Sequence, residues 1–226
     1  SSTLFPYTTL FRSRDGDVYY SVSTNDRKSE FTKYEHPFSI FHSCTIEAIV
    51  KSATGLTSQS VYACFNKINS AFNLQIDVKP HPQYEAHGYE TLIDGQRGGL
   101  DFRLGDWQGY YIDDFEAILD LKQNQHISKI GAGFLQDQNS WIFMPTEVLF
   151  YESNDSSAFK LIATVKNDVP QDYPEAIIKD FSINTDITAR YIKIRAKNLK
   201  FCPVWHKGFP YGGQTFIFID EIMLEN

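Results

Sequence analysis

Short segments that alternate apolar and polar residues recur along this chain, with polar turns between them. A period of two residues is typical of strands that bury one face, whereas a helix places apolar residues three and four positions apart. In residues 14–67 no stretch keeps the helical spacing over three turns. We therefore expect an all-β protein, and the regular recurrence of turns indicates antiparallel sandwiches.

The expected strands divide into an N-terminal set and a larger C-terminal set. The 226 residues are enough for one large β domain or two smaller ones, and an aromatic content of 15% favours strands. The N-terminal set comprises residues 18–22, 34–38, 44–50 and 58–65. The C-terminal set comprises residues 74–78, 115–121, 127–136, 146–153, 159–165, 176–183, 189–196 and 215–224.

The composition excludes several classes of function. A net charge of −7 argues against nucleic acid as a partner, because its binding depends on clustered Lys and Arg. No apolar run approaches the length of a membrane span. Cys44, Cys64 and Cys202 lack the spacing of a metal site. At most one disulfide can form among them, and we expect small buried side chains instead.

Residues 134–145 run from an apolar segment through five polar residues to Trp141 and back to an apolar segment. An indole offers a flat apolar face, while neighbouring groups such as Gln136 and Asp137 can bond hydroxyls. This stretch therefore fits recognition of a polar partner. It fits equally a structural loop whose tryptophan packs into the core.

Residues 3–13 do not resemble a protein family. They resemble the in-frame translation of a common sequencing adapter. We treat residues 1–13 as an artefact and exclude them from the fold. The expectation that follows is a metagenomic gene fragment whose true N-terminus is missing. The absence of a signal peptide then says nothing about localisation.

Residues 14–68 resemble the fibronectin-III-like domain that follows the catalytic barrel in bacterial chitobiases and β-hexosaminidases. The matching segments are residues 19–21, 34–38 and 45–48, whereas the usual Asp-Gly-Ser-x-Pro turn is replaced at residues 23–26. The match starts late in the domain, which implies that one or two opening strands are lost. The sheet edge that they cover would then be bare.

Residues 69–226 resemble a coagulation-factor type C domain, which is also called discoidin-like and overlaps carbohydrate-binding module family 32. A narrower resemblance is to the C-terminal region of Bacteroidetes-type family 20 β-N-acetylhexosaminidases. The broad resemblance is carried by residues 92–95, 115–121, 189–194 and 218–222. The narrower one is carried by five motifs in order, at residues 94–98, 102–109, 114–121, 134–145 and 202–208.

The resemblance implies a jelly-roll sandwich with a ligand site in the loops at one end. On that basis the best ligand contacts are Trp141, Trp205 and His206, with Gln136 and Asp137 as secondary ones. The expected ligand is a glycan of the N-acetylhexosamine or galactose type. The alternative for His206 is a buried structural histidine.

For three other side chains of these motifs the expected role is less specific. In the family the residue at Trp107 packs in the core, and we expect the same here. Arg97 and Arg103 can pair with Asp101 or Asp106, or they can bind a ligand; the sequence leaves both open.

A structural calcium ion is also implied by the resemblance. Calcium prefers several oxygen ligands, so Asp94 and Glu221 would supply charge and turn carbonyls the remaining ligands. The usual Asp-Gly-Asn-x-x-Thr-x-Trp spacing is stretched here, with Trp107 thirteen residues beyond Asp94, and the threonine ligand cannot be placed.

We predict no catalytic residues in this chain. Glycoside hydrolysis needs two carboxyl groups that face each other, whereas the adjacent pairs 113–114 and 220–221 point to opposite faces of a strand. The chain is interpreted as the accessory region of a β-N-acetylhexosaminidase that is periplasmic, at the cell surface or secreted. Its expected partner in cis is the catalytic domain of that parent protein. Adhesion, protein interaction or docking on the catalytic barrel are the alternatives to sugar binding.

Overall fold

The computed structural model of the chain describes residues 16–24, 27–41, 44–65 and 72–225. The chain divides into two compact units, residues 1–67 and 68–226. The described residues form strands and four short 3-10 helices without an α-helix, so the predicted all-β class is confirmed. The adapter-like residues 3–13 and the predicted boundary between residues 68 and 69 lie outside the described residues.

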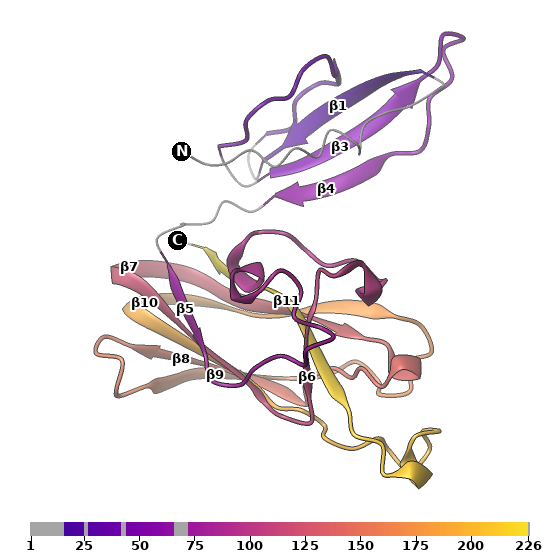
Figure 1. Ribbon diagram of the computed structural model, residues 1–226. Coiled ribbons are helices and arrows are strands. Elements are labelled where there is room, and N and C mark those ends of the chain that lie inside the picture. Colours follow the sequence, from indigo (N-terminus) through magenta and orange to yellow (C-terminus); the bar gives the residue numbers. More distant parts are fainter. Residues whose placement is uncertain (1–15, 25–26, 42–43, 66–71, 226) are drawn as a thin grey trace. The chain divides into compact units, whose positions relative to one another are not determined.

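The first unit contains one four-stranded antiparallel sheet in the order β2-β1-β3-β4 (Figure 1). The register places Tyr20 beside Ala48, and Ala48 beside Val61, so these side chains share one apolar face. On edge strand β4, Val61 and Phe65 are exposed. The strands are β1 (Asp17–Ser23), β2 (Thr32–Lys33), β3 (Cys44–Lys51) and β4 (Val61–Phe65).

The strand predicted at residues 34–38 is wrong. This segment is irregular, and its Phe38 ring stacks on Tyr20 with ring centroids 4.6 Å apart. Pro37 has no N–H to donate to a sheet ladder, which disfavours a paired strand here. The segment covers the apolar face of the sheet with side chains instead of extending it.

The second unit is a sheet of seven strands in the order β6-β11-β7-β10-β8-β9, with β5 also paired to β7. Two of these strands, β7 and β10, are much longer than the rest and pair along almost their whole length. The sequence predicts two separate strands in each place, and the structure joins them. The strands are β5 (Asn73–Ile76), β6 (Gln108–Tyr111), β7 (Phe115–Gln136), β8 (Glu147–Ser153), β9 (Lys160–Lys166), β10 (Ile177–Ala196) and β11 (Phe216–Glu225).

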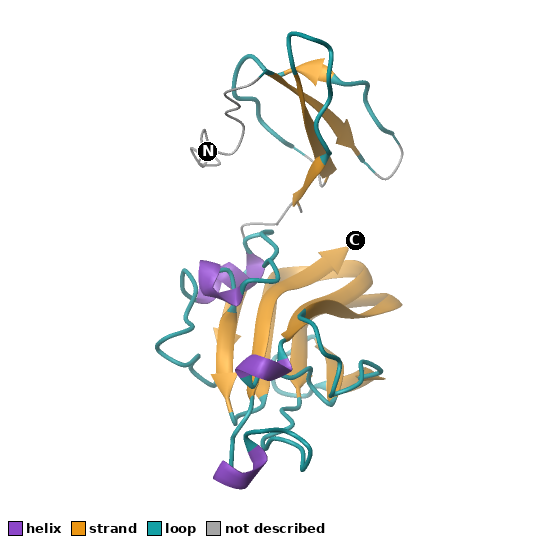
Figure 2. Cartoon of the chain, turned by 90° about the vertical axis from the view of Figure 1, so that its right-hand side faces the viewer, coloured by secondary structure: helices purple, strands orange, loops and turns teal. Residues whose placement is uncertain are grey.

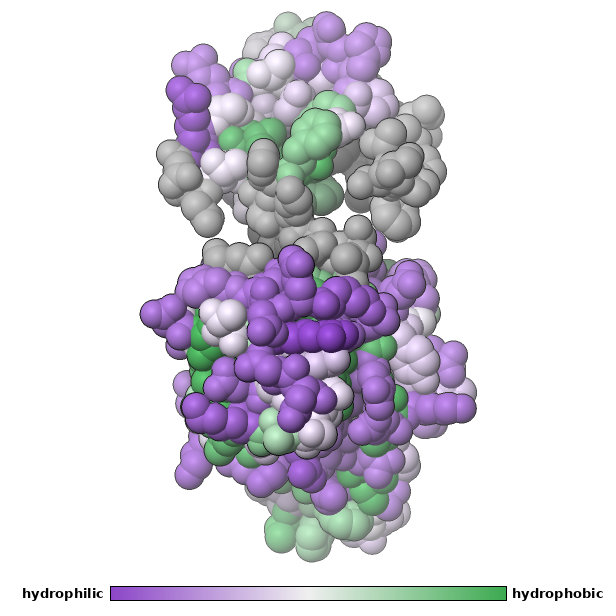
Figure 3. Space-filling view, turned by 90° about the vertical axis from the view of Figure 1, so that its left-hand side faces the viewer, coloured by the Kyte–Doolittle hydropathy of each residue, from purple (hydrophilic) through white to green (hydrophobic). Residues whose placement is uncertain are grey.

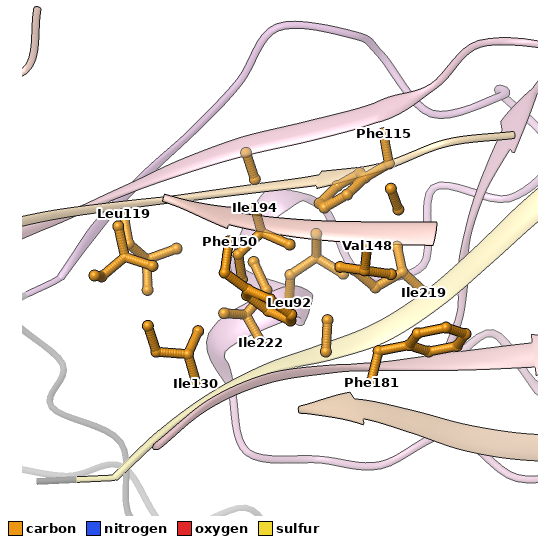
Figure 4. Close-up of a cluster of buried hydrophobic side chains, with 14 of the residues drawn as sticks. Leu92, Phe115, Leu119, Ile130, Val148, Phe150, Phe181, Ile194, Ile219 and Ile222 are labelled. Carbon is orange, nitrogen blue, oxygen red and sulfur yellow. The ribbon is translucent and has the colours of Figure 1, made fainter. Parts of the chain in front are cut away.

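The β7–β10 pair bends in the middle. Its register shifts between residues 184 and 187 and again between 189 and 191, and Lys122 has a left-handed φ of 70°. Irregularities of this kind bend and twist paired strands. The two halves of β7 consequently contribute to one core, where Leu119 from the first half and Ile130 from the second both lie (Figure 4).

The bend turns one continuous ladder into two packed layers. The first half of β7 pairs with β5 and with the second half of β10, which continues to β8 and β9. The second half of β7 pairs with β11, which continues to β6. Buried side chains from both layers meet between them, including Phe150, Ile194 and Ile219 (Figure 4). The arrangement is a β-sandwich, as expected.

Trp107 lies in the interior, which confirms its predicted core position. Its side chain is 1% exposed, and the indole Nε1–H donates to the carbonyl of Gly99 over 2.9 Å. The ring lies against the backbone of Gly98, where an added Cβ would clash with three indole atoms. Gly98 is therefore required by the close approach of this ring.

We predict that Gly98→Ala lowers the free energy of unfolding by about 1–3 kcal/mol, because the added methyl overpacks the Trp107 site. Gly99→Ala is the matched control, since a Cβ at Gly99 meets nothing within 4 Å. Urea denaturation of both variants measures the effect. Equal stability of the two variants would contradict the close packing at Gly98.

Candidate functional site

Two loops form one end of the second unit, and we call this end the tip. It consists of residues 137–146, which connect β7 to β8, and residues 197–215, which connect β10 to β11. The short helix η4 (Phe209–Tyr211) marks the tip at the lower end of the unit (Figure 2). The tip also includes η3 (Gln138–Ser140).

Asn198 fixes the base of the tip. Its side-chain amide donates to the carbonyls of Asp113 and Thr215 over 3.2 and 3.3 Å, and its Oδ1 accepts from the Thr215 hydroxyl over 2.7 Å. Further out, the N–H of Cys202 donates to the carbonyl of Gly213 over 2.8 Å and closes the longer loop. Chain segments far apart in the sequence are thereby held together at one end.

Trp141 ends the polar turn that the sequence singled out. The turn is closed by Ser140, whose hydroxyl donates to the Asp137 carboxylate over 2.8 Å. Trp141 has a left-handed φ of 64°, and its half-buried ring packs on Gly208 and Gly213, where an added Cβ would come within 3.0 and 3.1 Å of the indole. The longer loop thus supports one side of this ring.

His206 lies between the two tryptophans of the tip. Its ring centroid is 6.2 Å from that of Trp141, 5.5 Å from that of Trp205 and 5.6 Å from that of Phe143. Nδ1 accepts the N–H of Gly208 over 3.0 Å, so the proton lies on Nε2, which donates to a backbone carbonyl over 2.8 Å. The ring is 5% exposed. It occupies the position of the buried structural histidine, with no nitrogen left for a ligand.

The other predicted ligand contacts differ in how far they are exposed. Gln136 is fully buried; its Nε2 donates to the carbonyl of Pro170 over 2.8 Å and its Oε1 accepts the N–H of Met144. Asp137 is half-buried, with one carboxylate oxygen bonded to Ser140. Trp205 is half exposed. The structure therefore leaves Trp205, Trp141 and Asp137 accessible and buries Gln136 and His206.

Sequence reasoning missed most of the exposed side chains on the longer loop. Beside Trp205, four large apolar side chains are exposed there: Phe201, Val204, Phe209 and Tyr211. The available signal was the mixture of aromatic residues with Pro203, Pro210, Gly212 and Gly213, because turn residues between aromatics keep those aromatics at the surface.

The predicted metal ligands come together at a second place, away from the tip loops. The N–H of Gly95 donates to Glu221 Oε2 over 3.0 Å, and Asp94 lies next to it in the same turn. Burial and the nearby Asp94 charge raise the pKa of Glu221 to about 9. Burial also raises the pKa of Asp94. Burial and nearby carboxylates that disfavour the charge of both groups fit the electrostatics of a hard cation.

The side chains at this place do not by themselves provide enough ligands for a metal ion. Among the residues that the structure describes, no group of three or more His, Cys, Asp or Glu side chains is arranged to hold a metal ion. A cation at Asp94 and Glu221 would need its remaining ligands from backbone carbonyls, which is the arrangement that the family resemblance implies.

Arg97 and Arg103 are both engaged by carboxylates. Arg103 pairs with Asp101 over 3.2 Å at the surface, which is one of the two partners expected. Arg97 has unexpected partners: its Nε donates to the buried Asp220 over 2.8 Å, and its guanidinium also bonds Asp180 over 2.5 Å. The N–H of Gly98 adds a bond to Asp220 over 2.9 Å. The loop that contains Asp94 is thereby tied to β11.

We predict that Arg97→Gln lowers the free energy of unfolding by about 3 kcal/mol, because it leaves the fully buried Asp220 carboxylate without its cation. Arg103→Gln is the matched control and should cost less than about 1 kcal/mol, since both partners of that pair are exposed. Chemical denaturation of both variants measures the difference. A loss at Arg97 no larger than that at Arg103 would contradict the tie to β11.

No protein-family model matches the chain, and no curated protein matches it. Among solved structures, the chain is similar to CpGH89CBM32-5 from Clostridium perfringens in complex with GalNAc-β-1,3-galactose. The two are 15% identical with a TM-score of 0.44, over 69% of this chain and 95% of that one.

Two further solved structures have a similar chain fold. CBM32-1 from a family 31 glycoside hydrolase of Clostridium perfringens is 14% identical with a TM-score of 0.44, over 72% of this chain and 99% of that one. The CBM32 of AlyQ in complex with 4,5-unsaturated mannuronic acid is 13% identical with a TM-score of 0.43, over 71% of this chain and 96% of that one. In the described part of the chain, no helix is long and apolar enough to cross a membrane.

Proposed function

We propose that the chain is a non-catalytic carbohydrate-binding region of a glycoside hydrolase and that it binds sugar at the tip. One observation carries this proposal: two indole rings, on loops more than sixty residues apart in sequence, flank the same buried histidine. The apolar C–H face of a sugar ring stacks on an aromatic ring, so an exposed indole held in place by its neighbours is a suitable platform.

The roles of the predicted residues follow from their exposure. Trp205 is the principal stacking surface, and the half-buried Trp141 lies against the same His206 ring. Asp137 is the acceptor for a sugar hydroxyl, since it is only half-buried and Ser140 bonds one of its two carboxylate oxygens. His206 supports both indole rings and bonds the polar turn at Gln138, whereas Gln136 ties the tip loop at Met144 to Pro170.

We also propose the type of ligand, the parent protein and its location. The ligand is a glycan of the N-acetylhexosamine or galactose type. The parent protein is a β-N-acetylhexosaminidase, in the periplasm, at the cell surface or secreted. Docking of the tip on the parent's catalytic domain is a second candidate, and the exposed aliphatic side chain of Val204 favours it because sugars stack on rings.

We predict that Trp205→Ala lowers the affinity for N-acetylglucosamine- and galactose-type oligosaccharides by about tenfold or more, because it removes the stacking surface. Leu104→Ala is the control, since Leu104 is an exposed apolar residue outside the tip loops. A glycan array followed by titration calorimetry of both variants gives the measurement. Unchanged binding by Trp205→Ala, or no sugar binding by the unaltered chain, would contradict the proposal.

We further propose that a calcium ion binds at Asp94 and Glu221. Bound calcium would stabilise the loop after η1 (Tyr89–Ile93) by compensating the charges of the half-buried Asp94 and the buried Glu221. The ion is structural on this proposal and takes no part in sugar stacking.

We predict that calcium at one hundred times its dissociation constant stabilises the chelator-treated protein by about 2.7 kcal/mol. The measurement is the melting temperature by scanning calorimetry, which should rise by several degrees. Glu221→Gln should abolish the rise, because it removes a charged ligand while keeping an acceptor for the Gly95 N–H. An equal rise in this variant, or no rise in the unaltered chain, would contradict the site.

A further inference from the structure

The longer loop of the tip exposes an unusual amount of apolar surface for its length. Tyr211 is 84% exposed and Val204 76%, and three further large apolar side chains are exposed within residues 201–211. Hydrophobic residues gather at this lower end of the second unit (Figure 3). Several large apolar side chains exposed on one loop indicate a binding surface.

The loop is held in one conformation, so these side chains are presented in a fixed arrangement. Residues 201 and 214 form an isolated bridge, and Cys202 and Gly213 bond across the loop. Inside it, the N–H of Phe209 donates to the carbonyl of His206 over 3.0 Å. Gly212 takes the left-handed φ of 63° that ends η4. The rings need little ordering when a ligand binds, which favours affinity.

The buried polar side chain against Trp205 is already bonded. His206 uses both ring nitrogens within the protein, so it offers none to sugar hydroxyls. Recognition of one particular sugar needs such fixed donors and acceptors. The exposed rings of Phe201, Trp205 and Tyr211 fit instead a ligand with a repeated flat apolar face.

We propose that the tip binds the flat face of an insoluble polysaccharide made of β-linked pyranoses with equatorial hydroxyls, of the chitin or cellulose kind, across several sugar units. The inference rests on the proposed function and extends it from a single sugar to a surface. In such polysaccharides the axial C–H groups make both faces of the chain apolar, and one of these faces can contact several rings together.

The charge of the tip is compatible with this ligand. Residues 197–214 contain no Asp or Glu. Of the three lysines there, Lys197 is bonded to Glu147 over 2.6 Å and Lys200 lies 3.8 Å from Asp114. A lipid bilayer also accepts exposed aromatic residues. The net charge of −7, however, repels the chain from an anionic membrane, and one or two free lysines do not make a polybasic cluster.

The test is co-sedimentation of the full chain with microcrystalline chitin and cellulose. Tyr211→Ala and Phe201→Ala are compared with the control Leu104→Ala, and circular dichroism checks that each variant is folded. We expect the unaltered chain and the control to be retained, and each ring variant to be retained roughly three- to tenfold more weakly. Binding of soluble sugars at Trp205 should persist in both ring variants.

Four outcomes would overturn the inference. Soluble sugars that bind while neither solid retains the chain would refute the polysaccharide surface and leave the proposed function intact. Retention that both ring variants keep in full would also refute it. Sedimentation with vesicles of neutral and anionic phospholipid, without retention on either solid, would assign the tip to a membrane. Failure to bind soluble and insoluble sugars alike would refute the proposed function as well.

Discussion

The rest of the second unit depends on the bend in the β7–β10 pair. These two strands form one continuous antiparallel ladder, and the bend folds that ladder over so that its halves lie in opposite layers of a sandwich. The buried side chains of both halves then share a single core (Figure 4). The bend also has a functional consequence. It returns the start and the end of β7 to the same end of the unit, where their loops meet the connection between β10 and β11.

The tip is therefore a product of tertiary structure. Its support consists of small or buried residues: Asn198 at the base, Gly208 and Gly213 under the Trp141 ring, and His206 between the two indoles. Because these positions satisfy the polar groups of the loops internally, the surface that remains for a ligand is dominated by aromatic side chains. This balance favours stacking over hydrogen bonding as the main mode of recognition.

The sequence predicted much of the fold and less of the site. Alternation of apolar and polar residues located most strands, and Trp107 and Cys202 were correctly expected to be buried. Periodicity does not reveal whether neighbouring strands are continuous, so β7 and β10 were each divided. Likewise, residue type does not reveal exposure. His206 has the chemistry of a ligand contact, yet both of its nitrogens bond the backbone. Arg97 reaches carboxylates more than eighty residues away, which no local pattern indicates.

The central claim is that ligand contacts the chain at the tip through Trp205, with Trp141 beside it. The most direct measurement is the nitrogen–proton correlation spectrum of the chain, in which each of the three tryptophans gives one indole N–H signal. On titration with a chitin- or galactose-type oligosaccharide, the signals of Trp205 and Trp141 should shift, whereas that of Trp107, buried and bonded to Gly99, should stay in place. A stationary Trp205 signal under conditions where sugar binds would contradict the account.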